Sequence, residues 1–298
     1  METRLHYKPT VSRIIFMIFA VAILILIAIA CFLPIWHVIM ASISDPTELN
    51  VSKGLIVKPL KKVDFTAYKM ILQYKSLWQG YRNTLMYIVL SCVITGVLTV
   101  IAGYVFSRTR FYYRNTFMLI ISFTMLFNGG MIPTYMVIKS LGMLDTVWAI
   151  VIPGSLNVFN IILMRTSMQG ISDALEEAAR LDGANDFVIM FRIILPLCKA
   201  TFAVVMLFTI VMKWNDYMSA LLYLPQRTDL FPLQMALRKI LYETSKEITS
   251  ASDVNATSVY ARSVEYAAIV VSTLPILCVY PFVQKYFVTG MTVGAVKA

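Results

Sequence analysis

Residues 83–107 read Asn-Thr-Leu-Met-Tyr-Ile-Val-Leu-Ser-Cys-Val-Ile-Thr-Gly-Val-Leu-Thr-Val-Ile-Ala-Gly-Tyr-Val-Phe-Ser, without one Asp, Glu, Lys or Arg. A helix needs roughly 20 apolar residues to cross a hydrocarbon layer of about 30 Å. The stretch is therefore long enough for one transmembrane helix. Strands of a membrane β-barrel would alternate apolar and polar residues with a period of two over roughly ten residues, and this pattern is absent.

Similar runs recur on both sides of this stretch. Four further segments contain no charged residue: 14–44, 115–138, 146–164 and 266–284. A sixth apolar segment, about 200–224, contains only Lys213 and Asp216 as charged residues. We therefore predict six transmembrane helices. The first run is too long for the h-region of a cleaved signal peptide, which has about 7–15 residues, so we expect a retained helix.

The composition of the whole chain agrees with this interpretation. Of 298 residues, 59% are hydrophobic and 14% are charged, and the mean hydropathy is +0.74. A soluble domain has about 25% charged residues, so this chain has too few polar groups to cover a surface that faces water. We predict an all-α integral membrane protein. Residues 1–82 would form an N-terminal tail, the first helix and an extracytoplasmic segment, and residues 83–298 a core of five helices.

The distribution of basic residues predicts the orientation in the membrane. A net charge of +10 can indicate nucleic-acid binding, but in membrane proteins basic residues more often lie at the lipid headgroups on the cytoplasmic side. The loop after residue 107 and the segment 165–199 are both rich in Arg and Lys, at Arg108, Arg110, Arg114, Arg165, Arg180, Arg192 and Lys199. We expect both loops and the N-terminus to be cytoplasmic, and we expect no nucleic-acid partner.

Two long segments would then lie on the outer side, at 45–82 and 225–263. The first departs from the charge rule because it is also basic, but long segments weigh less in that rule. The second places Leu233, Ala236, Leu237 and Ile240 on one helical face. Contact with lipid is the commoner explanation for such a surface helix, and contact with a partner protein is the alternative.

The sequence contains no catalytic or metal-binding constellation. Its four cysteines form no C-x-x-C pair, and His6 and His37 are its only histidines, so neither a zinc site nor a disulfide framework is predicted. We expect His37 to serve in packing or at the interface. The phosphate-binding pattern G-x-x-x-x-G-K-[ST] is absent. We therefore expect no cofactor on this chain and no enzymatic activity, with the energy supplied by another polypeptide.

Residues 171–196, Ile-Ser-Asp-Ala-Leu-Glu-Glu-Ala-Ala-Arg-Leu-Asp-Gly-Ala-Asn-Asp-Phe-Val-Ile-Met-Phe-Arg-Ile-Ile-Leu-Pro, predict two short helices joined by a sharp turn. Asp173 and Glu176 resemble a capping box, and Glu176 with Arg180 forms an i,i+4 pair. Gly183 is expected to close the first helix. Asp186 can cap the second helix, and Pro196 is expected to end it.

The predicted first helix has one face with small residues at its middle, formed by Leu175, Ala178, Ala179 and Asp182. Small residues permit the close approach of another backbone, as they do between membrane helices. A helical hairpin that lies flat on the lipid surface fits the same pattern. The pattern by itself leaves both interpretations open.

A motif in this segment resembles that of a known family. Glu177-Ala178-Ala179 is followed after three residues by Gly183, and after nine more by Ile193-x-Leu195-Pro196. This spacing resembles the EAA signature of ABC importer permeases. The resemblance implies the type I importer fold, in which a cytoplasmic coupling helix docks on a separate ATPase. It implies a coupling role for the residues Glu177, Ala178, Ala179, Asp182, Gly183, Leu195 and Pro196.

The same resemblance implies a set of partners. In that family a second homologous permease, two ATPase subunits that bind ATP and Mg²⁺, and an extracytoplasmic solute-binding protein complete the transporter in the bacterial cytoplasmic membrane. Further segments are similar to the carbohydrate-uptake branch, at 102–108 and 214–217, and the ending 288–298 is similar to that of the maltose-type second permease. Segments 128–135 and 141–148 are similar to the subgroup that imports oligosaccharides and polysaccharide fragments, which implies such a substrate.

Two charged residues interrupt the fifth apolar segment one helical turn apart. A charge in mid-membrane costs at least about 2.5–3.5 kcal/mol, so Lys213 and Asp216 are expected to face the protein interior and to pair. In one interpretation they form part of a wall that contacts sugar, with Trp214, Asn215 and Tyr217, because aromatic faces and amides suit hydroxyl-rich rings. In the other, which we favour, Lys213 and Asp216 are a structural ion pair.

Two other classes of function remain as alternatives to an ABC permease. An ion-driven transporter would need intramembrane acids or histidines as a relay, and only Asp216 qualifies. A membrane-embedded enzyme would need clustered acid, base or metal-ligating residues, which the sequence lacks.

Overall fold

The computed structural model describes residues 10–127, 129–250 and 256–295, and within these ranges every regular element is helical. Contacts divide the chain into two compact units. The first combines the part up to Ile71 with Glu243–Val271, and the second combines Leu72–Tyr242 with the part from Ser272 onward. The N-terminal residues with Arg4, His6 and Lys8, residue Asn128 of the segment 128–135, and residues 296–298 of the C-terminal motif lie outside the described residues.

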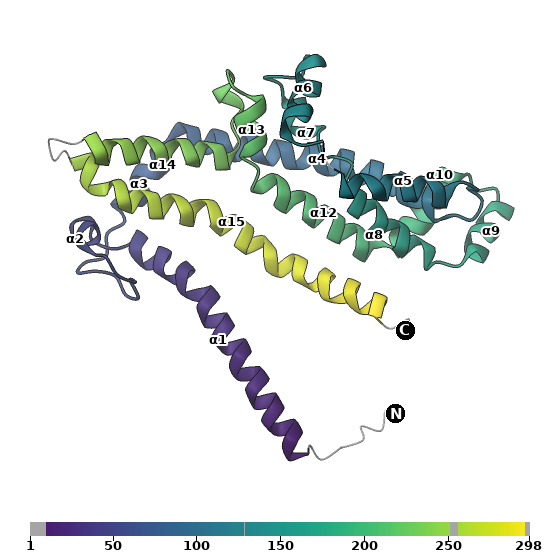
Figure 1. The fold of residues 1–298 in the computed structure, drawn as a ribbon, viewed down its shortest axis with the longest axis horizontal. Helices are drawn as coiled ribbons and strands as arrows, with labels where there is room; N and C mark the ends of the chain where they lie inside the picture. Colours follow the sequence, from purple (N-terminus) through teal and green to yellow (C-terminus); the bar gives the residue numbers. More distant parts are fainter. Residues whose placement is uncertain (1–9, 128, 251–255, 296–298) are drawn as a thin grey trace. The chain divides into compact units, whose positions relative to one another are not determined.

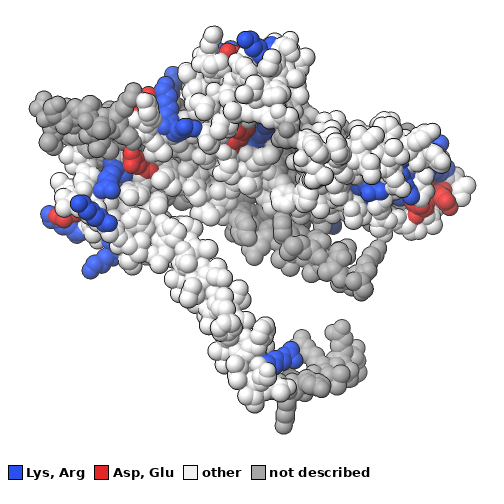
Figure 2. Space-filling view, viewed as in Figure 1, with Lys and Arg blue, Asp and Glu red and all other residues white. Residues whose placement is uncertain are grey.

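The first unit is built around the C-terminal end of helix α1. Its elements are α1 (Val11–Ser42), α2 (Pro46–Val51), most of α3 (Thr66–Gln73) and the first half of α15 (Ala256–Ala295). The surface of α1 in Figure 2 carries basic side chains only near its N-terminal end, as expected for a helix in lipid. Its C-terminal end is different, because Ala41 is buried with Leu49 and Ile56 against Tyr266.

Hydrogen bonds fold the segment 45–65 back onto α1 and α15. The backbone N–H of Ile56 donates to Nδ1 of His37 over 3.0 Å, and the His37 ring packs edge-on against Tyr266. The hydroxyl of Tyr260 donates to Asp64 over 3.3 Å, and Arg262 donates to the carbonyl of Leu49 over 3.1 Å. His37 is therefore a packing residue, as expected.

The second unit is organised around helix α4 (Lys75–Ser107), along which α8 (Val158–Gln169) and α12 (Lys199–Trp214) pack (Figure 1). Gly103 permits the closest approach, because a Cβ atom at this position would lie 2.9 Å from Cβ of Met164. The remaining elements are α5 (Arg114–Leu126), α6 (Met131–Ser140), α7 (Val147–Val151), α9 (Asp173–Leu181), α10 (Asp186–Val188), a π-helical turn (Ile189–Ile194), α11 (Leu195–Leu197), α13 (Met218–Tyr223), a 3-10 turn (Thr228–Leu230), the part of α14 (Leu233–Ser250) up to Tyr242 and the second half of α15.

Fewer continuous spans are present than the six predicted. Within the described residues, three helices are long and apolar enough to cross a membrane, in α1, α4 and the part of α15 at Val259–Cys278. Two helix pairs qualify only if each bent pair counts as one span: α5 with α6, which meet at 113°, and Asp186–Leu197 with α12, which meet at 86°. The structure thus has three to five candidate spans.

The predicted helix at 146–164 is not continuous. The chain leaves helical geometry after α7 and resumes it in α8, and Pro153 and Gly154 lie between them. Proline lacks a backbone N–H, and Gly154 has a φ of +81°, which a helix interior does not permit. The segment 200–224 is likewise divided into α12 and α13. Hydropathy detected the apolar segments but not these breaks.

The expectation that the apolar face of 233–240 rests on lipid is wrong. Leu233, Ala236, Leu237 and Ile240 are all buried, and the first residues of α14 pack on the N-terminal part of α4. The backbone N–H of Leu233 donates to Oγ1 of Thr84 over 2.8 Å, and a Cβ atom at Gly80 would lie 3.0 Å from Cα of Leu233. This face is part of the core of the second unit.

Candidate functional site

The segment 171–196 forms a helical hairpin between α8 and α12, as predicted, but Pro196 does not end its second half, because it lies inside α11, which follows the π-helical turn directly. Its first helix, α9, begins one residue earlier than the proposed cap implies: Ser172 is the N-cap, its side chain accepts from the N–H of Ala174, and Asp173 is already helical. In the same way Asn185 rather than Asp186 caps α10, accepting from the N–H of Val188 over 2.9 Å. In each case the residue just before the proposed cap also has a side chain that can cap. Its non-helical backbone conformation makes that residue the N-cap.

The turn between the two helices depends on Gly183. Its φ of +84° lies in the left-handed region, and its N–H donates to the carbonyl of Arg180 while that of Ala184 donates to Ala179. These two bonds form a Schellman motif, which satisfies the last carbonyls of α9. Gly183 therefore closes the helix, as predicted. Apart from Gly183 and its two chain neighbours, no atom in the described parts of the chain lies within 4 Å of the position that a Cβ would occupy there.

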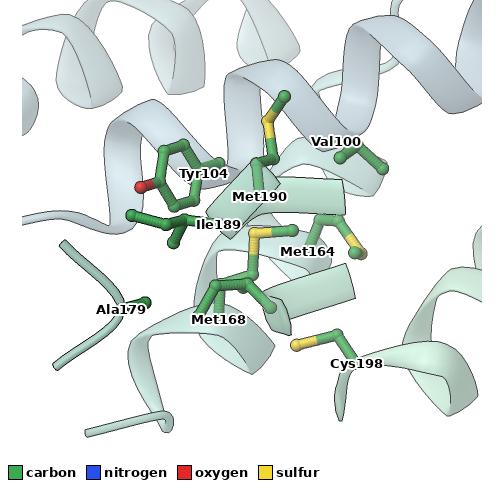
Figure 3. Close-up of a cluster of buried hydrophobic side chains, with 9 residues drawn as sticks. Val100, Tyr104, Met164, Met168, Ala179, Ile189, Met190 and Cys198 are labelled. Atoms are coloured by element: carbon green, nitrogen blue, oxygen red, sulfur yellow. The ribbon is translucent and has the colours of Figure 1, made fainter. Parts of the chain in front are cut away.

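An apolar core fixes the hairpin to α4 and α8. Figure 3 shows side chains from α4, α8, α9 and the π-helical turn converging on one cluster, which contains Val100, Tyr104, Met164, Met168, Ala179, Ile189, Met190, Ile194 and Cys198. Ala179 is only 9% exposed. Its small size therefore brings α9 close to its own supporting helices. A contact of Ala179 with a partner stays a prediction.

A network of charged side chains lies beside this core. The guanidinium of Arg108, at the C-terminal end of α4, contacts Asp173 at 3.1 Å and Glu176 at 3.3 Å. The predicted pair of Glu176 and Arg180 is present at 2.7 Å, and Arg180 also contacts Asp186 at 2.5 Å. The hydrogen bond with Glu176 raises the pKa of the Arg180 guanidinium, with a smaller contribution from the charge of Asp186.

Sequence reasoning missed the part of Arg108 in this network. It assigned Arg108 only to the basic loop, because Arg108 and Asp173 are 65 residues apart and no local spacing relates them. The buried partner of Arg108 was missed as well. Glu176 is buried, whereas the next acid along the same helix, Glu177, is exposed.

The outward surface of the hairpin combines apolar and small residues. Leu181 is 89% exposed, Phe187 67% and Leu175 42%. The residues Glu177, Ala178, Asp182, Gly183 and Pro196 are exposed too, and Leu195 is half-buried. Acidic and basic side chains gather at this end of the second unit in Figure 2. The exposed surface of α9 and α10 is therefore mixed: it has large apolar side chains, small residues at Ala178 and Gly183, and acidic side chains among them.

The five residues proposed for a sugar-contacting wall have other contacts. Nζ of the buried Lys213 donates to the carbonyl of Ile150 over 2.5 Å and lies 3.9 Å from Asp216, whose carboxylate accepts from the N–H of Ser219. The remaining three are a buried Trp214, which packs against Tyr81, an exposed Asn215, which donates to its own helix at Val211, and Tyr217, whose ring lies beneath the guanidinium of Arg238.

A cavity of about 300 Å³ opens one turn before Lys213, between α8 and α12, and sequence reasoning did not identify it. Two phenylalanine rings line it with their centroids 6.1 Å apart, and Asn160, which is only 5% exposed, lines it as well. The full lining is Gly154, Asn157, Phe159, Asn160, Phe208, Thr209 and Met212. Within the described residues, no group of three or more His, Cys, Asp or Glu could hold a metal ion.

Comparison with known proteins defines the class. The family model of the binding-protein-dependent transport system inner membrane component matches residues 96–293. The chain belongs to this family, and it is therefore a multi-pass inner-membrane permease of an ABC importer and not the ATPase of that transporter. The predicted class of protein is thereby confirmed.

Several relatives are covered over nearly their whole length. The polygalacturonan/rhamnogalacturonan transport system permease protein YtcP of Bacillus subtilis (strain 168) is 37% identical, across 92% of this chain and 95% of that protein. The arabinooligosaccharides transport system permease protein AraQ of Halalkalibacterium halodurans is 25% identical, across 91% and 93%. A crystal structure of a bacterial ABC transporter involved in the import of the acidic polysaccharide alginate contains a similar chain, with a TM-score of 0.83, 35% identity and coverage of 94% and 99%.

Proposed function

We propose that this permease imports acidic oligosaccharides, of the kind that polysaccharides rich in uronic acids release. Two relatives support this substrate class, since one is named for polygalacturonan and rhamnogalacturonan and the other belongs to an importer of alginate. Both names denote carbohydrate chains with carboxylate groups. The transporter would comprise this chain, a second homologous permease, two ATPase subunits and an extracytoplasmic solute-binding protein.

The chain would cross the membrane six times. The three long helices and the two bent pairs supply five crossings, and α7 with α8 supplies the sixth as a broken span. Irregular backbone at membrane depth is tolerated where protein buries it or where it borders a water-filled cavity. The break between α7 and α8 satisfies this condition, because Gly154 and Asn157 line the cavity. The N-terminus and the hairpin would both be cytoplasmic.

The hairpin would be the site at which the ATPase docks. The observation that carries this proposal is a hairpin with a packed core that exposes three large apolar side chains, Leu175, Leu181 and Phe187, together with the small residues Ala178 and Gly183. Glu177, Ala178, Asp182 and Gly183 would contact the ATPase, whereas Leu195 and Pro196 would position the second half of the hairpin.

The cavity between α8 and α12 is our candidate for contact with sugar. Phe159 and Phe208 offer ring faces, and Asn157 and Asn160 bring amide groups to the same cavity. Sites for small ligands typically combine apolar walls with a few polar groups in this way. Lys213 and Asp216 would stabilise the wall behind it rather than bind sugar, because their polar atoms are engaged by Ile150 and Ser219.

Transport by the complete reconstituted transporter tests the docking role. Glu177→Trp places a bulky side chain on the exposed surface of α9, so uptake and binding-protein-stimulated ATP hydrolysis should both be lost while the chain still inserts into the membrane. Met136→Trp, at a 63% exposed position in α6, is a control for the added bulk. Normal uptake by the Glu177→Trp transporter would contradict the docking role.

The energy source is tested separately. Uptake into proteoliposomes loaded with ATP should continue when ionophores dissipate the ion gradients. Loss of uptake in the presence of ionophores would instead favour an ion-driven transporter.

A further inference from the structure

We propose that Arg108 is a positioning residue that makes α4 move together with the coupling hairpin. α4 is not adjacent to the hairpin in the sequence, whereas α8 and α12 continue directly from its two ends. A force on the hairpin therefore reaches α8 and α12 through the backbone, but it reaches α4 only through side chains. The inference rests on the proposed docking of the ATPase on this hairpin.

Arg108 contacts the last turn of α8 and the start of α9, where the chain enters the hairpin. Nη2 donates to the carbonyl of Met168 in the last turn of α8 over 3.0 Å, and Nη1 contacts Asp173 in the first turn of α9 over 3.1 Å. Nε faces Glu176 one turn further along α9, at 3.3 Å. One guanidinium thus joins the end of α4 to the end of α8 and to the start of α9. Arginine suits this role because its donors are fixed in a planar fork.

Tyr104 adds a second connection from the same helix. Its hydroxyl donates to Oε1 of Glu176 over 3.0 Å, and the guanidinium of Arg108 lies 5.4 Å from the centre of its ring. The tyrosine ring itself belongs to the apolar cluster with Met168 and Ala179. Glu176 therefore receives two groups from α4 on one side and Arg180 of its own helix on the other.

Burial makes this connection stiff. The side chain of Arg108 is 8% exposed and that of Glu176 is 10% exposed. Nε of Arg108 and Oε2 of Glu176 form a buried ion pair at 3.3 Å, and neither atom makes a hydrogen bond in the described part of the chain. Separation of the hairpin from the end of α4 would leave the largely buried guanidinium of Arg108 without either of its acidic partners, Asp173 and Glu176, which is unfavourable. The hairpin and the end of α4 are therefore expected to move as one body.

The proposal predicts a particular defect when Arg108 is replaced. Without the guanidinium, the ATPase can still bind the exposed surface of α9, but its motion should no longer be transmitted fully to α4. In the Arg108→Gln transporter we therefore expect ATP hydrolysis to continue while the sugar imported per ATP falls roughly five- to tenfold, within the range of a lost coupling interaction. Arg108→Lys should fall between the two, because lysine restores the charge but not the fork.

The experiment uses the complete transporter in proteoliposomes, with ATPase binding, ATP hydrolysis and uptake measured on the same preparation. Arg110→Gln is the matched control: Arg110 is exposed, two residues further on, and takes part in no ion pair within the described residues. A purely structural role would lower ATP hydrolysis and uptake together. The defect of the double variant Arg108→Gln/Glu176→Gln should be smaller than the two single defects combined, since both substitutions remove the contact between Arg108 and Glu176.

The possible results separate this inference from the docking proposal. Uptake per ATP equal to that of the unmodified transporter in Arg108→Gln would overturn the inference, even if the ATPase binds as expected. If Arg108→Gln does not assemble, Arg108→Lys and Glu176→Gln are measured in the same way, and unchanged uptake per ATP in both would overturn it. If the ATPase does not bind the unmodified hairpin at all, the docking proposal itself fails, and ATPase binding shows this directly.

Discussion

At the residue scale, Gly183 has two separable properties, its backbone conformation and its lack of a side chain. Asparagine adopts the left-handed region more readily than most residues, and apart from Gly183 and its two chain neighbours no atom of the described residues lies within 4 Å of a Cβ at this position. Gly183→Asn should therefore leave the thermal stability of the purified chain nearly unchanged. Gly183→Val should lower its stability by about 1–2 kcal/mol, because valine is strained in the left-handed region. Both variants should weaken capture of the ATPase, because each adds a side chain to the docking surface.

Gly183→Asn is the informative variant of the two, since it tests the surface without disturbing the helix. Thermal melting and co-purification of the ATPase on the same preparation measure the two effects. Full ATPase capture by Gly183→Asn would show that this part of the hairpin is not in contact with the ATPase.

Lys213 gives a second test at this scale. Lys213→Met removes the hydrogen bond to the carbonyl of Ile150 and leaves the carboxylate of Asp216 without the nearby positive charge of Lys213. We therefore expect a loss of about 1–3 kcal/mol in stability. Asn215→Ala is the control, because its exposed amide bonds only to its own helix, and its effect should stay within about 0.5 kcal/mol. Thermal melting of the two variants makes the comparison. A Lys213→Met chain that is fully stable but imports no sugar would restore the interpretation of a sugar-contacting wall.

At the element scale, the contact between α4 and α8 depends on Gly103. A methyl group there would lie 2.9 Å from Cβ of Met164 and 3.3 Å from the backbone nitrogen of Arg165. Both residues belong to α8, and a backbone atom can move only if the helix moves. Gly103→Ala should therefore force the helices apart and cost about 1–3 kcal/mol.

Gly96→Ala in the same helix is the control for Gly103→Ala. Its methyl group would meet only the end of the Phe202 ring and the Met206 methyl, at 3.4–3.5 Å, and alanine favours the helix. Thermal melting should therefore separate the two variants. Equal melting temperatures would contradict the close packing of α4 on α8.

The segment 45–65 should respond to acid through Asp64. A hydrogen bond from the Thr66 side chain, and then one from the Thr66 backbone N–H, hold the pKa of Asp64 below its ordinary value of 3.8. Because the folded pKa is lowered, its stabilising contribution is complete at neutral pH and is lost as the pH falls below 3.8 through the lowered pKa. The melting temperatures of the unmodified chain and Asp64→Asn should therefore differ at pH 7 and converge in acid. A difference that is independent of pH would exclude this role.

The elements also show what the sequence can and cannot predict. Apolar runs and the signals around Gly183 predicted the membrane class, the hairpin and its closing residue, because these depend on local composition and backbone conformation. The breaks between α7 and α8 and after α12 were not predicted, since hydropathy averages over them. The neighbours of Ala179, Arg108 and Leu233 were missed for a different reason: each is determined by residues far away in the sequence, which no local spacing reveals.

At the scale of the whole molecule, the chain is one component of an importer whose energy comes from another polypeptide. Its second unit combines the three features that this role needs. These are an exposed hairpin, a packed and ion-paired connection from the hairpin to α4, α8 and α12, and a cavity between α8 and α12. In the proposed mechanism, motion at one end of these helices would change the cavity within the same unit.

Crosslinking from Leu181 tests the central claim most directly. This side chain is 89% exposed at the end of α9, so a photoreactive amino acid at this position should form a covalent product with the ATPase subunit in the assembled transporter. The same group at Met136, which is exposed in α6, should give no such product. We predict that Leu181 crosslinks to the ATPase. Crosslinking of Leu181 to lipid alone, with the ATPase present, would contradict the account.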